Sequence, residues 1–314
     1  MAHSIKNRKK REKKMRVLNK QIRRLTEMAS HHWQKGEIEM RLSHVALGDL
    51  RRRWRQKETP LHAALLRKVR SFKRVKISKN KPLRILGSDG GLLVYGVALN
   101  CKELVDRLYK SILEAPRPKH YTFKGKKRSD YQSWHWTAWA KYRHQPFMSR
   151  EYLDAPKEAD EFFKDNQMAF SQMSTILGQC APGVFKRFQM YPLPDGVKRL
   201  CGAWAGCTIN KGGNNPNQTN RHRDASEAQY GYSGLVSCGD YHRGGLVLWE
   251  LEIVLEMEPG DVVIFADAVI THSNKEARGV RSSVVCFTQE NMYSYWNRKY
   301  NMRLRRKERK LNKS

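Results

Sequence analysis

The spacing of apolar and polar residues predicts a core of short strands with helices beside it. Residues 83–86 and 92–99 are apolar runs of strand length, joined by a turn rich in glycine. In residues 101–114 and 160–177 the apolar side chains recur at helical spacing, and Pro116 follows the first of these segments. Strand-like runs separated by turns return in the C-terminal half. We therefore predict a mixed α+β fold.

The N-terminal part has a different pattern. Residues 5–30 and 37–72 contain few helix breakers and many good helix formers, so we expect basic helices, or disorder that becomes ordered on nucleic acid. The length of 314 residues leaves room for one sizeable domain plus extensions. The predicted organisation is a nucleic-acid-binding extension over residues 1–80, a folded domain over 81–297 and a basic tail over 298–314.

Charge is concentrated at the two ends of the chain. Of the formal net charge of +31, residues 1–80 hold 25 Lys and Arg against 6 Asp and Glu, and residues 298–314 hold 9 against 1. Such runs are typical of segments that bind a polyanion, and we expect a monomer whose partner is nucleic acid. A merely solvated charge run is an alternative. An anionic membrane surface is the weakest alternative, because no apolar face accompanies the charges.

Apolar segments, cysteines and basic clusters together indicate the cellular compartment. No run of eighteen apolar residues exists, and no apolar segment follows the basic N-terminus, so we expect neither a membrane span nor a secretory signal. The six cysteines include no C-x-x-C pair and are expected to be reduced thiols packed in a core. Because the Lys and Arg clusters also fit localisation signals, we expect a nuclear protein.

Two histidines and one aspartate have the spacing of a metal site. His222 and Asp224 flank Arg223, so on an extended strand their side chains share one face. His272 lies forty-eight residues after Asp224, beyond two apolar strands and a P-G-D turn. Two imidazoles and one carboxylate on one side of Fe(II) leave positions open for a bidentate co-substrate and dioxygen. This set predicts an iron site that supports oxidation.

A second pair of residues follows His272. Arg281 opens an apolar strand, and alternation places Ser283 beside it. A guanidinium holds a carboxylate through two parallel hydrogen bonds, so the pair suits the distal carboxylate of 2-oxoglutarate. His242, in a glycine-rich turn, is interpreted as a solvated loop residue, and the histidines of the N-terminal segment as surface residues.

Taken in order, H-x-D, G-G-x-L, P-G-D, the second histidine and R-x-S resemble the double-stranded β-helix of the Fe(II)/2-oxoglutarate dioxygenases, a jelly-roll, cupin-like fold. The runs Gly244–Leu251 and Gln289–Met292 add a resemblance to the TET/JBP family, and to its short fungal members, over roughly residues 185–297. The resemblance implies a dioxygenase domain over 81–297 with Fe(II), 2-oxoglutarate and dioxygen. It also implies oxidation of a methylated base flipped out of double-stranded DNA.

The resemblance also indicates which side chains read the base. Glu227 stands where animal members place an asparagine on the flipped base, and Gln289 where they place a histidine. A carboxylate accepts from an exocyclic amino group and an amide both donates and accepts, so 5-methylcytosine is favoured and N6-methyladenine stays open. Asn220 is a third candidate for substrate contact. An oxygenase acting on RNA or protein, and a non-catalytic nucleic-acid-binding module of the same fold, remain alternatives.

Two further segments have both a structural and a functional interpretation. Residues 131–144 interleave aromatic residues with cations, so their rings either stack on bases or fill the core. The run 211–218 is rich in glycine and asparagine and lies just before the predicted iron strand, where it is suited to substrate contact.

Overall fold

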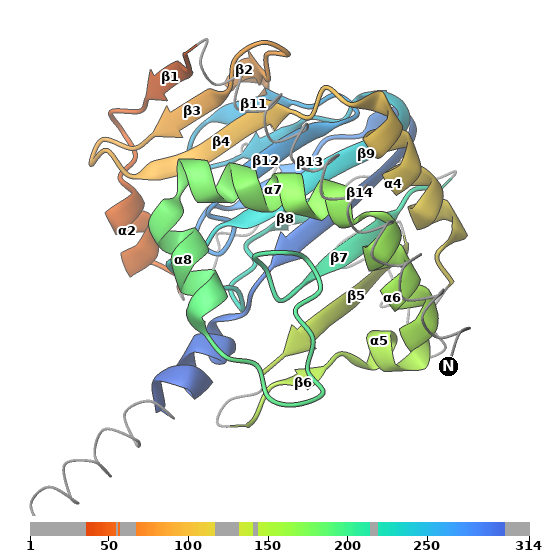
Figure 1. Ribbon diagram of the computed structural model, residues 1–314. Helices are drawn as coiled ribbons and strands as arrows, with labels where there is room; N and C mark the ends of the chain where they lie inside the picture. Colours follow the sequence, from red (N-terminus) through yellow and green to blue (C-terminus); the bar gives the residue numbers. More distant parts are fainter. Residues whose placement is uncertain are drawn as a thin grey trace, which may run out of the picture.

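A computed structural model of the chain describes residues 36–54, 56, 67–116, 132–140, 144–213 and 219–298. This part of the chain forms two β-sheets. Helices cover the near side of the larger sheet in Figure 1, and the smaller sheet lies on its far side.

The larger sheet has nine strands. Their spatial order is β1 (Ile38–Arg41), β3 (Leu83–Leu86), β4 (Leu92–Ala98), β12 (Asp261–Phe265), β9 (Ser233–Arg243), β14 (Ala277–Phe287), β7 (Gly206–Lys211), β5 (Gln132–Trp139) and β6 (Phe147–Met148). Every neighbouring pair is antiparallel except β1 and β3, which run parallel.

The smaller sheet has five strands. Their order is β2 (Lys73–Lys76), β11 (Ile253–Glu256), β10 (Leu246–Leu248), β13 (His272–Asn274) and β8 (Thr219–His222). From β8 to β14 the chain passes between the two sheets, because β9, β12 and β14 belong to the larger sheet and β8, β10, β11 and β13 to the smaller. This alternation is a jelly roll, and it confirms the predicted double-stranded β-helix within an α+β protein.

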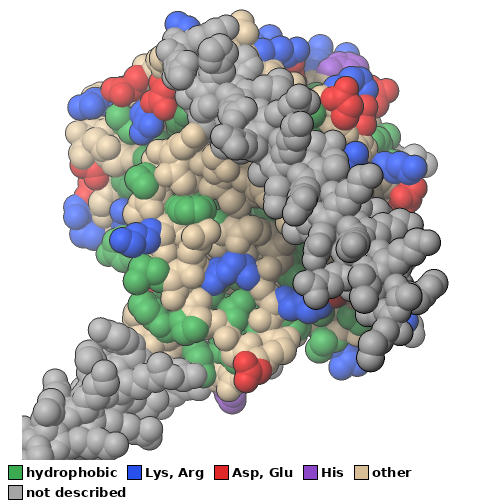
Figure 2. Space-filling model, in the orientation of Figure 1, with side chains coloured by type: hydrophobic (Ala, Val, Ile, Leu, Met, Phe, Trp, Pro, Cys, Tyr) green, Lys and Arg blue, Asp and Glu red, His purple; other side chains and the backbone are tan. Residues whose placement is uncertain are grey.

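Helices pack against one face of the larger sheet. They are α4 (Lys102–Glu114), α5 (Arg150–Asp154), α6 (Pro156–Asp165), α7 (Gln167–Cys180) and α8 (Pro182–Met190). Trp136 of β5 packs against Phe162 and Phe163 of α6, with ring centroids 5.3 and 6.1 Å apart. On the outside of this face, basic, acidic and apolar side chains are interspersed (Figure 2). The helices therefore cover this face of the jelly roll. The candidate site lies on the other face, between the two sheets.

The segment 160–177 is two helices where the sequence predicts one. α6 ends at Asp165 and α7 begins at Gln167. The buried Asn166 between them donates from its side-chain Nδ2 to the carbonyl oxygen of Phe162, 2.9 Å away. An asparagine that satisfies the last turn in this way ends a helix without glycine or proline.

The N-terminal part described here belongs to the folded body. Residues 36–76 supply β1, the helix α2 (Leu47–Arg52), the short 3₁₀ turn η1 (Val69–Ser71) and β2. The sequence favours basic helices, or disorder, over 37–72. Among the described residues of that range, β1 and turns stand beside the short helix α2, and the folded body begins before the expected boundary at residue 81. At residues 38–41, parallel pairing of β1 with β3 outweighs the local helix propensity. Just beyond residue 72, β2 pairs in parallel with β11. The predicted segment 5–30 lies outside the described residues.

The remaining expectations concern membrane-spanning helices, the cysteines and the C-terminal tail. Within the described ranges, no helix has both the length and the apolar character needed to cross a bilayer. All six cysteines fall in these ranges, none is in a disulfide, and five are buried. The tail 299–314 lies outside the described residues, while residues 290–298 are helical.

Candidate metal and co-substrate site

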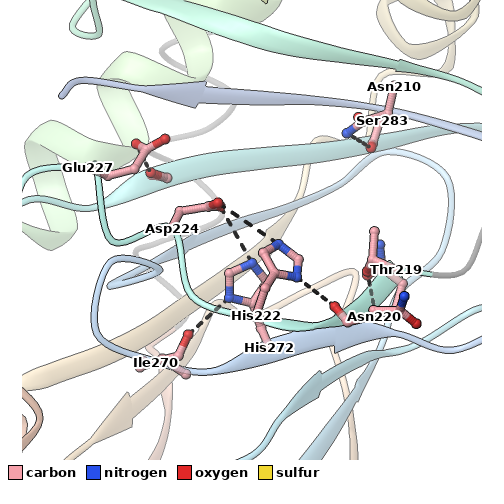
Figure 3. Close-up of polar contacts among 11 residues, drawn as sticks. Asn210, Thr219, Asn220, His222, Asp224, Glu227, Ile270, His272 and Ser283 are labelled. Carbon is pink, nitrogen blue, oxygen red and sulfur yellow. Dashed lines mark hydrogen bonds and ion pairs between the residues drawn. The ribbon is translucent and has the colours of Figure 1, made fainter. Parts of the chain in front are cut away.

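The three predicted metal ligands come together at one end of the smaller sheet. His222 ends β8 and His272 begins β13, and the two are direct partners in the strand register. Asp224 Oδ1 lies 4.0 Å from His222 Nε2, and its Oδ2 lies 3.7 Å from His272 Nε2 (Figure 3). One donor atom from each residue falls within 4.8 Å of the others. Two imidazoles and a carboxylate thus face a common point, and this donor set suits Fe(II).

Asp224 is placed differently from the sequence expectation. β8 ends at His222, so Asp224 lies in the following loop and not on an extended strand. Its backbone N–H donates to the carbonyl oxygen of Asp267, 3.2 Å away. This contact with the segment after β12 turns the carboxylate toward the histidines.

Backbone carbonyls fix the ring orientation of both histidines. His222 Nδ1 lies 2.6 Å from the carbonyl oxygen of Asn220, and His272 Nδ1 lies 3.0 Å from that of Ile270. A carbonyl only accepts, so each Nδ1 carries the proton and each Nε2 presents its lone pair. Such contacts from outside the ligand set orient metal-binding imidazoles.

His272 is also held through its neighbours in the chain. The Trp249 backbone N–H donates to the carbonyl oxygen of Thr271 at 2.9 Å, and the Trp249 indole donates to Ser273 Oγ at 3.1 Å. Glu250 Oε2 accepts from the Thr271 backbone N–H at 2.8 Å, and its other oxygen accepts from the Thr271 hydroxyl. We call Trp249 and Glu250 the His272 clamp. Burial raises the pKa of Glu250, against the hydrogen bonds from Thr271.

A buried carboxyl next to Asp224 was missed by sequence reasoning. Asp267 is 2% exposed, and its carboxyl lies within 4.8 Å of those of Asp224 and Glu227. Burial, and then the negative charge of Asp224, raise the pKa of Asp267 well above its usual range. In the sequence it is merely an aspartate two residues after an apolar strand, with no spacing that marks it as part of a site.

Arg281 and Ser283 lie on β14 and face the smaller sheet. Trp136 of β5 packs against α6, whereas Ser133 of β5 pairs with Asn210 of β7, so Asn210 lies on the opposite face. Asn210 pairs with Ser283, which places Ser283 and Arg281 on that inner face. Arg281 is 3% exposed. Ser283 Oγ accepts from Asn210 Nδ2 of β7, 3.1 Å away. The structure thus places a buried guanidinium and a hydroxyl side by side on the wall opposite the histidines.

Two more neighbours of Arg281 and Ser283 were not predicted. Besides Asn210, the ring of Tyr241 lies beside the guanidinium, with its centroid 5.7 Å from the Arg281 Cζ. Burial raises the pKa of the Tyr241 hydroxyl, and the charge of Arg281 opposes that shift. Tyr241 also donates to Ser237 Oγ at 2.7 Å. Both are polar residues within strands, and their contact with Arg281 and Ser283 depends on strand register.

The three predicted substrate contacts are placed in two groups. Glu227 and Gln289 are partners in an isolated β-bridge and are both largely buried. Glu227 Oε2 accepts from Ser233 Oγ at 3.2 Å, and Gln289 Oε1 accepts from the Ala140 backbone N–H at 3.1 Å. Asn220 is exposed and lies on β8, where its carbonyl oxygen faces His222. Most of the asparagine-rich run lies outside the described residues.

Comparison with known proteins adds evidence on the fold. No protein-family model matches the sequence, and the curated proteins include no match. Among solved structures, NgTET1 in complex with 5mC DNA is similar, with 13% identity, a TM-score of 0.54, and coverage of 79% of this chain and 92% of that chain. The chain has the jelly-roll fold of the 2-oxoglutarate oxygenases. At this identity the likeness is one of fold.

Two further solved structures are matched more distantly. OsALKBH1 is 14% identical with a TM-score of 0.39, covering 62% of this chain and 96% of that chain. An oxidoreductase of the 2OG-Fe(II) oxygenase family from Burkholderia pseudomallei is 14% identical with a TM-score of 0.34, covering 80% and 94%.

Proposed function

We propose that the protein is an Fe(II)- and 2-oxoglutarate-dependent dioxygenase that oxidises methylated bases in DNA, with 5-methylcytosine as the favoured substrate. The observation that carries this proposal is the convergence of His222, Asp224 and His272 opposite the buried Arg281, inside a 2-oxoglutarate oxygenase fold. The substrate rests on the similarity of fold to a protein whose structure contains 5mC DNA.

The residues present fit the metal. His222 and His272 offer neutral Nε2 atoms, and Asp224 offers a carboxylate that offsets part of the charge of Fe(II). Bound there with 2-oxoglutarate and dioxygen, iron supplies oxidation of a carbon–hydrogen bond. The protein holds the ligand atoms in place, orients the rings and excludes water.

The inner face of the larger sheet fits the co-substrate. In the proposal, Arg281 holds the distal carboxylate through a charge-assisted pair of hydrogen bonds, and Ser283 donates a further one. Asn210 already donates to Ser283 Oγ, which leaves the hydroxyl proton of Ser283 for the carboxylate. Burial of Arg281 strengthens this contact, because little water competes for it.

Glu227 and Gln289 support an amino-bearing base. The side-chain oxygen of Gln289 is occupied by the Ala140 N–H, so its amide nitrogen remains to donate to a ring acceptor. The Glu227 carboxylate would accept from an amino group of the base, and the amide nitrogen of Gln289, its partner in the β-bridge, would donate. This pair matches the edge of cytosine, which donates from its amino group and accepts at the adjacent ring positions. Adenine has a similar edge, so N6-methyladenine is the second candidate base.

The partner in this proposal is double-stranded DNA, with the target nucleotide flipped into the site by a monomeric enzyme in the nucleus. A base inside the duplex cannot reach a buried metal, and flipping costs a few kcal/mol that contacts in the pocket offset. The concentration of positive charge at the chain ends supports a polyanionic partner, since phosphate contacts supply most non-specific affinity.

The deciding experiment is mass spectrometry of nucleosides after incubation with Fe(II), ascorbate and 2-oxoglutarate. Parallel arms contain duplex with 5-methylcytosine, duplex with N6-methyladenine, and methylated RNA. We expect 5-hydroxymethylcytosine and more oxidised forms from the first arm. Oxidation confined to another arm would show that the substrate is N6-methyladenine or RNA, and the proposed dioxygenase reaction would stand. Iron bound with no oxidised nucleoside and no succinate in any arm would point to a non-catalytic binding module.

A further inference from the structure

The aromatic residues of β5 divide between the two faces of the larger sheet. Trp134 and Trp136 are at most 1% exposed, and Trp136 packs against α6, as the core interpretation of this segment expects. His135 and Trp139 occupy the alternate positions. The His135 side chain is 37% exposed and Trp139 is half-buried.

Strand register places these two rings on the inner face. Ser133 of β5 pairs with Asn210 of β7, and Asn210 pairs with Ser283 of β14, so their side chains share the face that carries Arg281. His135 follows Ser133 by two residues and therefore lies on that face. β5 lies near the edge of the larger sheet, and β8, which carries His222, is the edge of the smaller one.

The two rings form a continuous aromatic surface with Phe287. Ring centroids are 5.2 Å apart for His135 and Trp139, 6.2 Å for His135 and Phe287, and 5.8 Å for Trp139 and Phe287. Gly206 of β7 lies between β5 and Phe287 in the register, and a Cβ there would lie 2.2 Å from Thr137. Only glycine lets the rings close over this position.

Phe147 extends the surface to the edge of the sheet. It is the direct register partner of Trp139, so the two side chains lie on one face. Phe147 is 38% exposed, so part of its ring is accessible to a ligand. We call His135, Trp139 and Phe147 the aromatic wall.

The aromatic wall is connected to the candidate metal site by a short series of contacts. The carboxyls of Asp224 and Glu227 lie within 4.8 Å, and Glu227 is the bridge partner of Gln289. Gln289 in turn accepts from the N–H of Ala140, the residue after Trp139. The aromatic wall is therefore adjacent to Glu227 and Gln289, the residues predicted to contact the base.

We propose that the aromatic wall is a stacking site for a nucleobase of the substrate strand, adjacent to the base that is oxidised. This inference rests on the proposed function and adds a subsite to it. The rings are tilted against one another, by 54° between His135 and Trp139, so a base would stack on the face of one ring and meet the edge of the next. Every base has a π-face, so the site takes purines and pyrimidines alike. The contact of His135 with Glu151, with Nδ1 and Oε1 3.6 Å apart, steadies the imidazole at the inner end of the wall.

The test is a binding cycle that combines protein variants with abasic DNA. Full-length protein is titrated with methylated oligonucleotides in which one base beside the target is replaced by an abasic site, position by position. We expect one abasic position to weaken binding of the unaltered protein about tenfold, and Phe147→Leu or Trp139→Leu to weaken binding of intact DNA by a similar factor. The two effects should not add, because both remove the same stacking interaction.

Controls separate stacking from damage to the fold. Trp139→Phe keeps a ring and should retain most of the abasic effect. Tyr109→Leu makes the same kind of change on α4, against the other face of the sheet, and should leave every titration unchanged. The visible absorption of Fe(II) with 2-oxoglutarate reports that a variant is folded. If Trp139→Leu does not show this absorption, the test relies on Phe147→Leu alone.

The outcomes distinguish this inference from the proposed function. Effects that add fully, or no sensitive abasic position, would overturn the stacking site even if the DNA is oxidised. A non-additive pair in a protein that yields no oxidised nucleoside would keep the stacking site and refute the dioxygenase.

Discussion

The inner faces of the two sheets hold their functional groups in different ways. On the smaller sheet, His222 and His272 lie at the ends of strands of four and three residues, and Asp224 lies in the loop after β8. Backbone carbonyls that accept from the two rings, and the His272 clamp on the neighbours of His272, fix the imidazoles. On the larger sheet, Arg281 lies within an eleven-residue strand that is paired on both sides. The candidate metal ligands thus depend on single polar contacts, whereas the proposed co-substrate residue Arg281 is part of a long paired strand.

The largest effect is expected on the metal side. Asp224→Ala removes the only carboxylate of the proposed ligand set and should abolish turnover and weaken Fe(II) binding, while DNA affinity stays nearly intact. Product formation by mass spectrometry and bound iron by metal analysis are the measurements. Asp240→Ala, at an exposed position of β9, is the matched control. Normal turnover by the Asp224 variant would refute the iron assignment.

On the larger sheet we expect a lower affinity without a change in geometry. Arg281→Met should cost about 2 to 4 kcal/mol of 2-oxoglutarate binding, since it removes a buried charge-assisted contact, and so raise the KM for 2-oxoglutarate roughly thirty- to a thousandfold. Fe(II) affinity should change little. Arg278→Met, at an exposed position three residues earlier, should behave as the unaltered protein. A raised KM in the Arg278 variant alone would move the carboxylate contact to that residue.

The His272 clamp should have a moderate effect, confined to the metal. Glu250→Gln keeps the volume of the side chain but weakens its grip on Thr271, and removal of such a hydrogen bond beyond the ligands lowers metal affinity about tenfold. Glu252→Gln, two residues on and paired with Lys68 at the surface, is the control. A competition assay with a chelator measures both. If both variants bind Fe(II) equally well, the clamp is only structural.

The smallest effect on chemistry is expected from the basic N-terminal segment. Residues 1–35 hold twelve Lys and Arg against two Asp and Glu. Removing them should lower the slope of log K against log salt by about 0.9 for each DNA phosphate that the shortened protein no longer neutralises. Oxidation of saturating short duplex should persist. Equal slopes for the two proteins would assign the DNA contacts to the folded body.

Local patterns were sufficient for some elements and not for others. α4 and β3 follow from the spacing of their apolar residues, and the structure confirms both segments. The break at Asn166 was missed because neither glycine nor proline marks it, and the contact of its side chain with the Phe162 carbonyl is seen only in the structure. The strand β2 was missed because its stabilisation comes from β11, far along the chain, and no window of neighbouring residues contains that information.

The candidate site divides in the same way. His222, Asp224, His272, Arg281 and Ser283 were recognisable because metal and carboxylate chemistry restricts residue type and order. Glu250, Asp267 and Asn210 were not, because each acts through a contact that exists only after the strands are in register. Spacing in sequence thus indicates the proposed metal and carboxylate ligands more readily than the residues that hold them.

The parallel pairing of β2 with β11 also affects the order of events during synthesis. The register joins Lys73 to Ile253, so β2 leaves the ribosome long before its partner exists. At about 5 to 20 residues per second this interval is on the order of ten to forty seconds. A waiting strand with an unpaired edge is prone to join other chains, and Lys and Arg on such a strand oppose that by mutual repulsion. Lys73, Arg74 and Lys76, all exposed around the buried Val75, therefore protect the nascent chain until β11 arrives.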